Sequence, residues 1–260
     1  MSENNASMPG TFCWADLGTS DAEAAKSYYS RLFGWSIFET GAGETAYTMF
    51  QIDGKDVVAV YSLNEEQRAQ GIPPHWVPYI SVENADEAAA KAWELGGKLL
   101  LGAFDVEGHG RMALIQDPTG ATFAVWQPLK HSGSAHLNQI GGMCWHELAT
   151  RDHETARKFY TGLFGWGTQL MDVGSTVYTT FTRSDGSQAG GLIQMTEEWG
   201  DIPPHWMIYF SVEDCDASSA KAKDLGGEVY VPPTDIPPVG RFSVIRDPQG
   251  ATFSVIKLSS

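Results

Sequence analysis

Apolar and polar residues follow two different periods along the chain, and the changes between them divide it into short strands and helices. Residues 11–18 alternate as in a strand, and apolar side chains then recur at helical spacing over Asp21–Phe33. Asp21 is typical of a residue that begins a helix, and Gly34 of one that ends it. Three strand-like runs follow, over 36–40, 46–52 and 57–62, with the turn Asp53-Gly54 between the last two.

The same order of elements then appears a second time. We expect a helix over 86–95 and strands over 77–82, 98–101, 111–115 and 122–126. The apolar side of that helix is predicted to consist of Ala88, Ala89, Ala92 and Trp93. The first half of the chain is therefore predicted to contain two βαβββ units.

The second half of the chain repeats the first at a nearly constant distance. Residues 117–123 match 247–253, and 72–76 match 202–206, in both cases 130 positions later. Phe33-Gly34-Trp35 recurs 131 positions later, at 164–166. One offset with a single-residue slip indicates two copies of one domain-sized module. We expect the modules over 9–127 and 140–258, joined by a polar linker at 128–139 that contains Gly and Ser.

Composition narrows the class of protein and its partners. The chain has 260 residues, of which 42% are hydrophobic and 19% charged, as in an ordinary globular protein. Its net charge of −15 disfavours nucleic acid and anionic membrane surfaces as partners. The polar residues 1–10 lack the basic region and apolar stretch that we would expect of a signal peptide, no apolar run reaches membrane-spanning length, and the 3 cysteines make no disulfide framework. We therefore expect a cytoplasmic protein.

Three motifs connect the modules to a known family. Trp14-Ala-Asp-Leu-Gly-Thr-Ser-Asp21 leads into Tyr28-Tyr-Ser-Arg-Leu-Phe-Gly-Trp35, the second copy has a similar segment at 159–166, and each module ends in an Asp-Pro-x-Gly turn. This order resembles the vicinal oxygen chelate superfamily, which includes glyoxalase I, bleomycin-resistance proteins and extradiol dioxygenases. The resemblance covers 9–258 and is greatest to two-module, glyoxalase-like members. It implies an α+β fold in which the paired βαβββ units of each module form a half-open mixed-sheet barrel with helices outside.

The resemblance also implies where a metal ion would bind. Metal-dependent members carry ligands on the first strand, the strand after the Pro-rich turn and the last strand of a module. The matching positions here are Trp14, Val77 and Ala124 in the first module and Trp145, Met207 and Ser254 in the second. None of these side chains offers the carboxylate or imidazole that such an ion requires. We therefore expect no metal and no cofactor, which disfavours standard glyoxalase chemistry.

Strand alternation predicts which side chains face the cavity that the resemblance implies. We expect an aromatic cleft whose ligand-binding residues are Trp14, Tyr79, Thr122, Trp126, Trp145, Glu147, Tyr209 and Thr252, with Asp16, Ser81, Ser211 and Ile256 on the same faces. An alternative of equal weight is that Trp14 and Trp145 only fill a disused cavity. Asp16 and Glu147 are candidate general bases, and hydrogen bonds to neighbouring Trp or Tyr groups are the alternative for both.

Other candidate residues have a structural alternative. His75 and His205 lie in Pro-Pro-His-Trp motifs, where a role in the turn is favoured over one at the cavity mouth or a metal. Arg111 and Arg241 either bind an anionic ligand or pair with the acidic surface. His146 follows Trp145 and precedes Glu147, so it should point to the opposite face of the strand.

Three functions remain open on this evidence. The favoured one is a metal-free protein of the glyoxalase and bleomycin-resistance type that binds a small hydrophobic or aromatic molecule, as a monomer with an internal pseudo-dimer or as a homodimer. The second is a metal-dependent lyase or isomerase, or a dioxygenase or hydroxylase-like enzyme, of the same superfamily. The third is a protein-interaction regulator of the kinase-binding type, which would need an exposed apolar patch.

Overall fold

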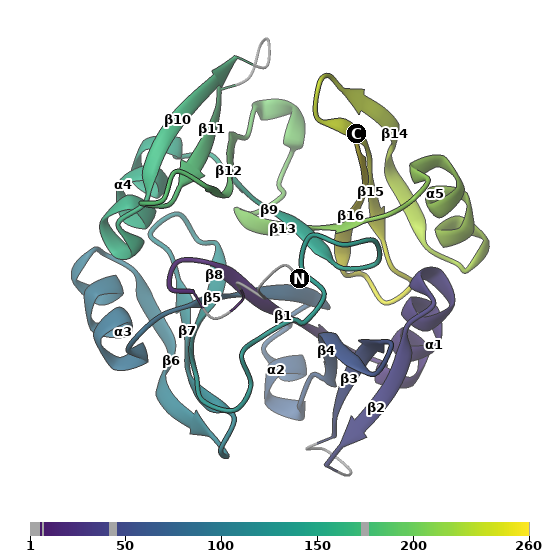
Figure 1. Cartoon of the computed structure of the whole chain (residues 1–260), viewed down its shortest axis with the longest axis horizontal. Helices are drawn as coiled ribbons and strands as arrows, with labels where there is room; N and C mark the ends of the chain where they lie inside the picture. Colours follow the sequence, from purple (N-terminus) through teal and green to yellow (C-terminus); the bar gives the residue numbers. More distant parts are fainter. Residues whose placement is uncertain (1–5, 7, 42–45, 173–176, 260) are drawn as a thin grey trace. The chain divides into compact units, whose positions relative to one another are not determined.

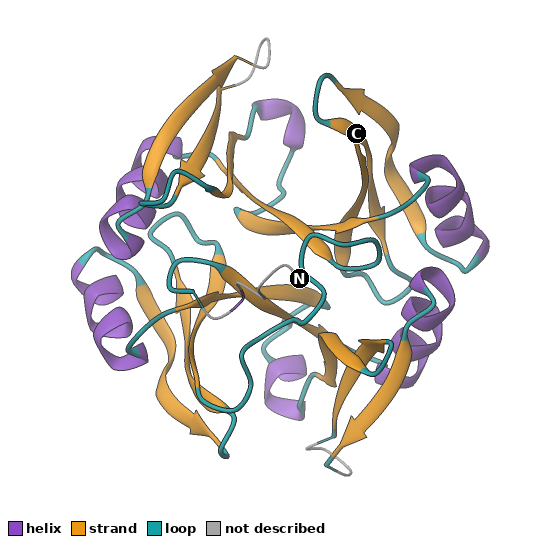
Figure 2. Cartoon of the chain, in the orientation of Figure 1, coloured by secondary structure: helices purple, strands orange, loops and turns teal. Residues whose placement is uncertain are grey.

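The computed structural model describes residue 6 and residues 8–41, 46–172 and 177–259. Its elements repeat the order βαβββ four times, as the sequence predicts (Figures 1 and 2). The elements of the first module are β1 (Phe12–Thr19), α1 (Ala22–Phe33), β2 (Ser36–Thr40), β3 (Tyr47–Ile52), β4 (Lys55–Ser62), α2 (Glu65–Ala69), β5 (His75–Ser81), α3 (Ala85–Glu94), β6 (Lys98–Val106), β7 (Gly110–Gln116) and β8 (Thr122–Pro128). Those of the second are β9 (Met143–Thr150), α4 (His153–Phe164), β10 (Gly167–Asp172), β11 (Val177–Thr182), β12 (Gln188–Gln194), η3 (Glu197–Trp199), β13 (His205–Ser211), α5 (Cys215–Asp224), β14 (Glu228–Ile236), β15 (Gly240–Arg246) and β16 (Thr252–Leu258).

Local signals begin and end the helices where the sequence predicts them. The Asp21 carboxylate accepts a hydrogen bond from the Ala24 amide at 3.0 Å, which caps the first turn of α1. Gly34 ends α1 with φ 77°, a left-handed conformation that suits glycine. Asp152 and Gly165 do the same for α4. Among the helices of the described ranges, none combines the length and the apolar character needed to cross a membrane.

The strands form two mixed sheets of eight strands each. Their orders are β2-β3-β4-β1-β5-β8-β7-β6 and β10-β11-β12-β9-β13-β16-β15-β14. The inner pairs β1–β4 and β5–β8 are parallel, and antiparallel hairpins extend each sheet outward. Neither sheet is a closed barrel, because its two outermost strands are not hydrogen-bonded to each other. The α+β class and the half-open arrangement agree with the prediction.

The contacts within the chain group it into two compact units. Unit 1 contains Met1–Trp14, Pro78–Gly133 and Trp145–Met207, and unit 2 contains Ala15–Val77, Ser134–Cys144 and Ile208–Ser260. Each unit therefore combines one half of the first module with the opposite half of the second. The module boundaries stay a prediction. They divide the chain by its sequence repeat, whereas the units divide it by contacts in space.

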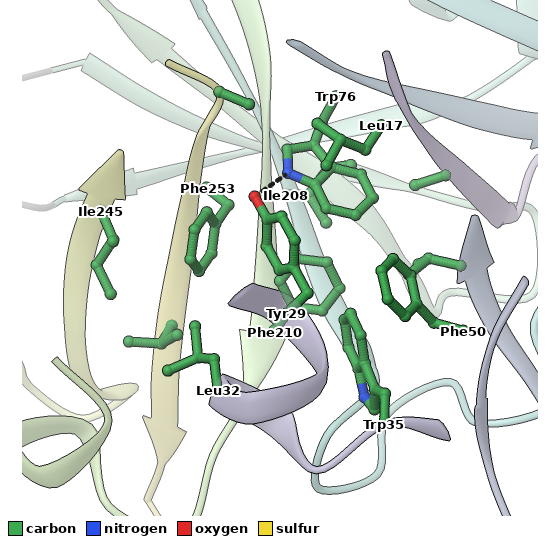
Figure 3. Close-up of a cluster of buried hydrophobic side chains, with 14 of the residues drawn as sticks. Leu17, Tyr29, Leu32, Trp35, Phe50, Trp76, Ile208, Phe210, Ile245 and Phe253 are labelled. Atoms are coloured by element: carbon green, nitrogen blue, oxygen red, sulfur yellow. Dashed lines mark hydrogen bonds between the residues drawn. The ribbon is translucent and has the colours of Figure 1, made fainter. Parts of the chain in front are cut away.

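Each unit has its own hydrophobic core between its helices and its strands. In unit 1, α3 and α4 contact each other, and Phe123, Tyr160 and Phe181 are among the fully buried side chains. In unit 2, α1 and α5 contact each other over a core in which Tyr29 lies among aromatic rings (Figure 3). The ring centroid of Tyr29 lies 5.4 Å from that of Trp76 and 5.4 Å from that of Phe253. The helix motif and the Pro-Pro-His-Trp motif thus both contribute aromatic residues to the cores, as Tyr29 with Trp76 and as Tyr160 with Trp206.

The structure corrects one prediction and adds two short helices. Trp93 was expected on the apolar side of α3 but is 66% exposed. The buried stripe consists of the small residues Ala85, Ala89 and Ala92, which let the helix approach the strands closely and leave the neighbouring indole outside. The segments α2 and η3 were not predicted, because their few polar residues have no amphipathic pattern.

Candidate functional site

The six positions that correspond to metal ligands in the superfamily that the sequence resembles do not form a metal site. Trp14 and Trp145 lie on β1 and β9, Val77 and Met207 on β5 and β13, and Ala124 and Ser254 on β8 and β16. Only the serine has a hydroxyl, and none has an imidazole or a carboxylate. Among the described residues, no group of three or more His, Cys, Asp and Glu side chains is arranged to hold a metal ion. The residues at these positions therefore do not fit the divalent ion of metal-dependent relatives.

In unit 1, several predicted ligand-binding residues lie together, and we call Trp14, Tyr79, Trp126 and His131 the Trp14 group. Trp126 contacts Tyr79 edge-on, with ring centroids 6.3 Å apart. His131 meets the ring of Trp14 at 4.6 Å and that of Trp126 at 6.1 Å, both edge-on. Trp14, Tyr79 and Trp126 are at most 7% exposed. The predicted aromatic character of this face is therefore present in the first module.

The predicted linker covers the Trp14 group rather than acting as a spacer. The indole N–H of Trp126 donates to the carbonyl of His131 at 2.9 Å, and the amides of Leu129 and His131 both donate to the carbonyl of His109. A Cβ on Gly133, whose φ is 104°, would lie 2.4 Å from the carbonyl oxygen of Cys13. Glycine is thus required where the linker passes over β1. His131 was not among the predicted site residues, because the linker was taken for a connection.

In unit 2, Asp16 lies beside two tyrosines. The hydroxyl of Tyr47 donates to the Asp16 carboxylate at 2.5 Å. Burial and the negative charge of Asp16 raise the pKa of Tyr61 to about 12. Asp16 is 5% exposed. Asp16, a candidate general base, therefore accepts a hydrogen bond from a neighbouring tyrosine, which is the structural role considered as its alternative.

In unit 1, Glu147 lies in an equivalent arrangement, and we call Trp145, Glu147 and Tyr178 the Glu147 group. The indole N–H of Trp145 donates to the hydroxyl of Tyr178 at 3.1 Å. The hydroxyl of Tyr178 is hydrogen-bonded to the Glu147 carboxylate, and burial together with that negative charge raises the pKa of Tyr178. All three side chains are half-buried. The phenol is therefore the protonated partner that donates to the carboxylate.

Sequence reasoning missed Tyr47 and Tyr178, although a signal was present. The two tyrosines are 131 positions apart, the same offset that separates Asp16 from Glu147. Each tyrosine lies two strands away from its carboxylate in the sheet order, so the strand pattern alone did not bring them together. The repeat offset would have identified them as a recurring pair.

The remaining predicted residues of the second module lie in unit 2. The rings of Tyr209 and Phe242 are 6.3 Å apart, on neighbours of β16. Ser254 is fully buried, and its hydroxyl has no hydrogen-bond partner. Phe253 and Val255 belong to the core, so Ser254 and the half-buried Thr252 face the opposite side of the sheet. This is the side that alternation predicted for a ligand, together with Ser211 and Ile256.

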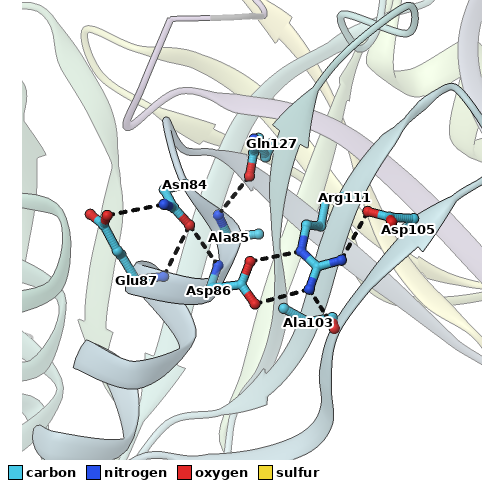
Figure 4. A network of polar contacts seen from close by, with 8 residues as sticks. All are labelled: Asn84, Ala85, Asp86, Glu87, Ala103, Asp105, Arg111 and Gln127. Atoms are coloured by element: carbon cyan, nitrogen blue, oxygen red, sulfur yellow. Dashed lines mark hydrogen bonds and ion pairs between the residues drawn. The ribbon is translucent and has the colours of Figure 1, made fainter.

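The two arginines are engaged in surface ion pairs. Arg111 binds both carboxylate oxygens of Asp86, at 2.7 and 2.9 Å, and one oxygen of Asp105, at 2.9 Å (Figure 4). Arg241 contacts Asp216 and Asp235 in the same way. Both arginines therefore pair with acidic residues of the protein surface, which is the second of the two roles considered for them. The bidentate contact of each guanidinium is made to an aspartate of the same chain.

The histidines also have structural partners. The Nδ1 atoms of His75 and His205 lie 2.7 and 2.8 Å from the carbonyls of Pro73 and Pro203, which supports the expected role in the turn. His146 is buried on the core side, where its ring stacks on Phe12 with centroids 4.1 Å apart and planes within 5°. Burial lowers the pKa of His146 to about 3, and its Nε2 has no hydrogen-bond partner. As expected, it points away from Glu147.

A surface depression lies elsewhere on the chain. It runs between α5 and β14 and is lined by Asp216, Ser219, Ala220, Lys223, Val229, Pro232 and Pro233. None of the predicted site residues lines it, and its Asp216 is held by Arg241. We assign it no role in the candidate site.

Taken with the two-module fold, comparison with known proteins establishes the class. The chain belongs to the Glyoxalase/Bleomycin resistance protein/Dioxygenase superfamily, whose family model matches residues 11–125 and 136–255. The resemblance inferred from the motifs is thereby confirmed.

Particular relatives carry different names. The chain is 38% identical over 250 residues to "Putative glyoxylase CFP32" of Mycobacterium tuberculosis, covering 95% of both chains. It is 37% identical over 265 residues to "Anthracycline biosynthesis protein DauV" of Streptomyces sp. (strain C5), covering 96% of this chain and 94% of the relative.

Solved structures share the fold at low sequence identity. The 2,3-dioxygenase LapB from Pseudomonas sp. KL28 has a TM-score of 0.66 at 12% identity, covering 96% of this chain and 92% of its own. The Mn(II)-bound glyoxalase from Novosphingobium aromaticivorans has a TM-score of 0.63 at 15% identity, covering 96% and 82%. These likenesses concern the fold alone.

Proposed function

We propose that this protein binds a flat aromatic small molecule through the aromatic side chains that line its sheets, without a metal ion. The observation that carries the proposal is the replacement of metal-ligand positions by Trp14 and Trp145, next to further aromatic residues. Indole rings offer large apolar faces for stacking, and a few polar groups beside them fix the orientation of a ligand. Binding of this kind requires no catalytic residue.

The names of the relatives are consistent with this proposal. Two of them, DauV and DnrV, are named for anthracycline biosynthesis, and anthracyclines are flat, fused-ring aromatic compounds. Chemistry of the glyoxalase or dioxygenase type would need a metal at positions that lack the donors for it. We therefore place the protein among the binding members of its superfamily rather than among the metal-dependent enzymes.

Replacing Trp145 should weaken the binding of a neutral probe such as acridine. We expect Trp145→Ala to raise the Kd by about tenfold, because it removes an aromatic stacking surface. Trp14→Ala should change the Kd less, because Trp14 is 4% exposed and lies against His131. Isothermal titration calorimetry on the full chain measures the effect. Trp93→Ala is the matched control, since Trp93 is exposed on α3 and should leave the Kd unchanged. Normal binding by Trp145→Ala would show that the assignment is wrong.

Metal content provides a second test. We expect purified, untagged protein to contain far less than one equivalent of any divalent ion when it is measured by mass spectrometry, because the residues that the structure describes provide no donor set for one. Retention of about one equivalent per module after dialysis would contradict the proposal and favour the enzyme alternative.

A further inference from the structure

The two modules carry the same pairing of a carboxylate with a tyrosine. Tyr47 donates to Asp16 in the first module, and Tyr178 is hydrogen-bonded to Glu147 in the second. Asp16 and Glu147 lie on equivalent strands, and their strand neighbours Leu17 and Leu148 belong to the hydrophobic cores. Both carboxylates therefore face away from the cores, on the side predicted for a ligand.

The Glu147 group is held in place by its surroundings in unit 1. Tyr178 donates to Glu147 while its oxygen accepts the indole N–H of Trp145 at 3.1 Å, so the phenol fixes both neighbours. A Cβ on Gly191 would lie 2.1 Å from the hydroxyl oxygen of Tyr178 and 3.1 Å from Nε1 of Trp145. The phenol and the indole occupy the space that any larger residue at this point of β12 would need. The glycine at this position of β12 therefore makes room for the contact between Tyr178 and Trp145.

The copy in the second module is more accessible than the copy in the first. Trp14 is 4% exposed and Asp16 is 5% exposed, and His131 of the linker lies edge-on against Trp14. Trp145 and Glu147 are both half-buried. The carboxylate-bearing side chain and the indole of the second module are therefore more exposed to solvent than their counterparts in the first.

We propose that the Glu147 group binds the positively charged nitrogen of a flat aromatic cation. The Glu147 carboxylate supplies the counter-charge, and the rings of Trp145 and Tyr178 offer electron-rich faces to a positively charged nitrogen. The net charge of −15 raises the local concentration of cations and disfavours anionic ligands. This inference rests on the proposed binding of aromatic molecules and adds the charge of the ligand and the module that holds it.

Two probes of similar shape and different charge separate the inference from the proposal on which it rests. At neutral pH 9-aminoacridine is a cation, whereas acridine is mostly neutral. We expect wild-type protein to bind 9-aminoacridine at least about tenfold more tightly than acridine. Glu147→Gln, which keeps the side-chain shape, should remove most of this preference and leave the Kd of acridine within about twofold. Calorimetry on the full chain measures all four values.

Asp16→Asn is the matched control, because it removes the corresponding charge in the covered module. It should keep the preference for the cation, and thermal unfolding of both variants should confirm that they are folded. If Glu147→Gln keeps the full preference, or if Asp16→Asn loses it instead, the assignment to the Glu147 group is overturned. If wild-type protein binds acridine as tightly as 9-aminoacridine, aromatic binding stands and the inference about charge fails. If it binds neither probe, the proposed function itself fails.

Discussion

Replacing Asp117 with alanine should lower the free energy of unfolding by about 3–5 kcal/mol. One carboxylate oxygen accepts hydrogen bonds from the amides of Thr119, Gly120 and Ala121, at 2.7, 2.9 and 3.1 Å. The other accepts the hydroxyl of Tyr160 at 2.9 Å. Asp117 is 3% exposed, so its removal leaves several buried donors without an acceptor. Urea unfolding followed by circular dichroism measures the loss.

The control for this experiment is another aspartate of unit 1. Asp105 pairs with Arg111, but its side chain is 74% exposed, and Asp105→Ala should therefore cost less than about 1 kcal/mol. Asp247→Ala should repeat the large effect in unit 2, because Asp247 accepts the hydroxyl of Tyr29 at 2.9 Å and the amides of its own turn. Equal small losses for Asp117→Ala and Asp105→Ala would show that the buried turn contributes little to stability.

Replacing His146 with phenylalanine should make the protein more resistant to acid. Burial lowers the pKa of His146 to about 3, so the folded protein keeps the imidazole neutral, whereas the unfolded chain binds a proton near the ordinary value of 6.5. As the pH falls from 6.5 toward 3, the unfolded state gains protons that the folded state does not, and stability is lost. Near pH 4.5 this difference should cost the wild-type protein about 2–3 kcal/mol.

The variant His146→Phe should lose that much less stability between pH 7 and about pH 4.5 in urea unfolding. The new ring can keep the stacking on Phe12, and it removes a buried nitrogen that has no partner. His109→Gln, at an exposed position, should show the same acid loss as the wild-type protein. Parallel losses in His146→Phe and in the wild type would mean that other groups carry the acid sensitivity. Burial also lowers the pKa values of His75, His153 and His205, but these residues are unchanged in the variant.

Much of the fold could be predicted because its signals are local. Asp21 and Gly34 mark the ends of α1 within a few residues of chain, and Asp53-Gly54 forms its turn with φ values of 52° and 72°. The opposite orientations of His146 and Glu147 followed from strand alternation alone. These features depend on residues that are close in the sequence, so they can be predicted from a single sequence.

The partners of the repeated motifs could not be predicted, because the two copies are alike. Tyr29 bonds to Asp247, which is 218 positions away, and Tyr160 bonds to Asp117. Each tyrosine had two similar Asp-Pro-x-Gly turns available, one in each module. The hydrophobic pattern and the aspartate acceptor are the same for both choices, and packing over the whole chain distinguishes them.

The candidate site was predicted in outline for a related reason. Alternation placed Trp14, Tyr79 and Trp126 on one face, and the structure groups them in unit 1. It gave no indication that His131 covers them, because a polar linker carries no signal of where it packs. The tyrosine that holds Glu147 lies on a strand paired only indirectly with that of Glu147, so its contact depends on sheet order.

The exchange of halves between the modules has a consequence for synthesis on the ribosome. Unit 1 is complete once Met207 has been made, whereas Ala15–Val77 must wait for Ile208–Ser260 before unit 2 can close. During that interval Tyr29 and Phe33 of α1 lack their partners Phe253 and Phe210 from the second module and remain open to wrong contacts. Elongation speed and chaperone supply should therefore influence the yield of this protein more than that of one whose modules fold in the order of their sequence.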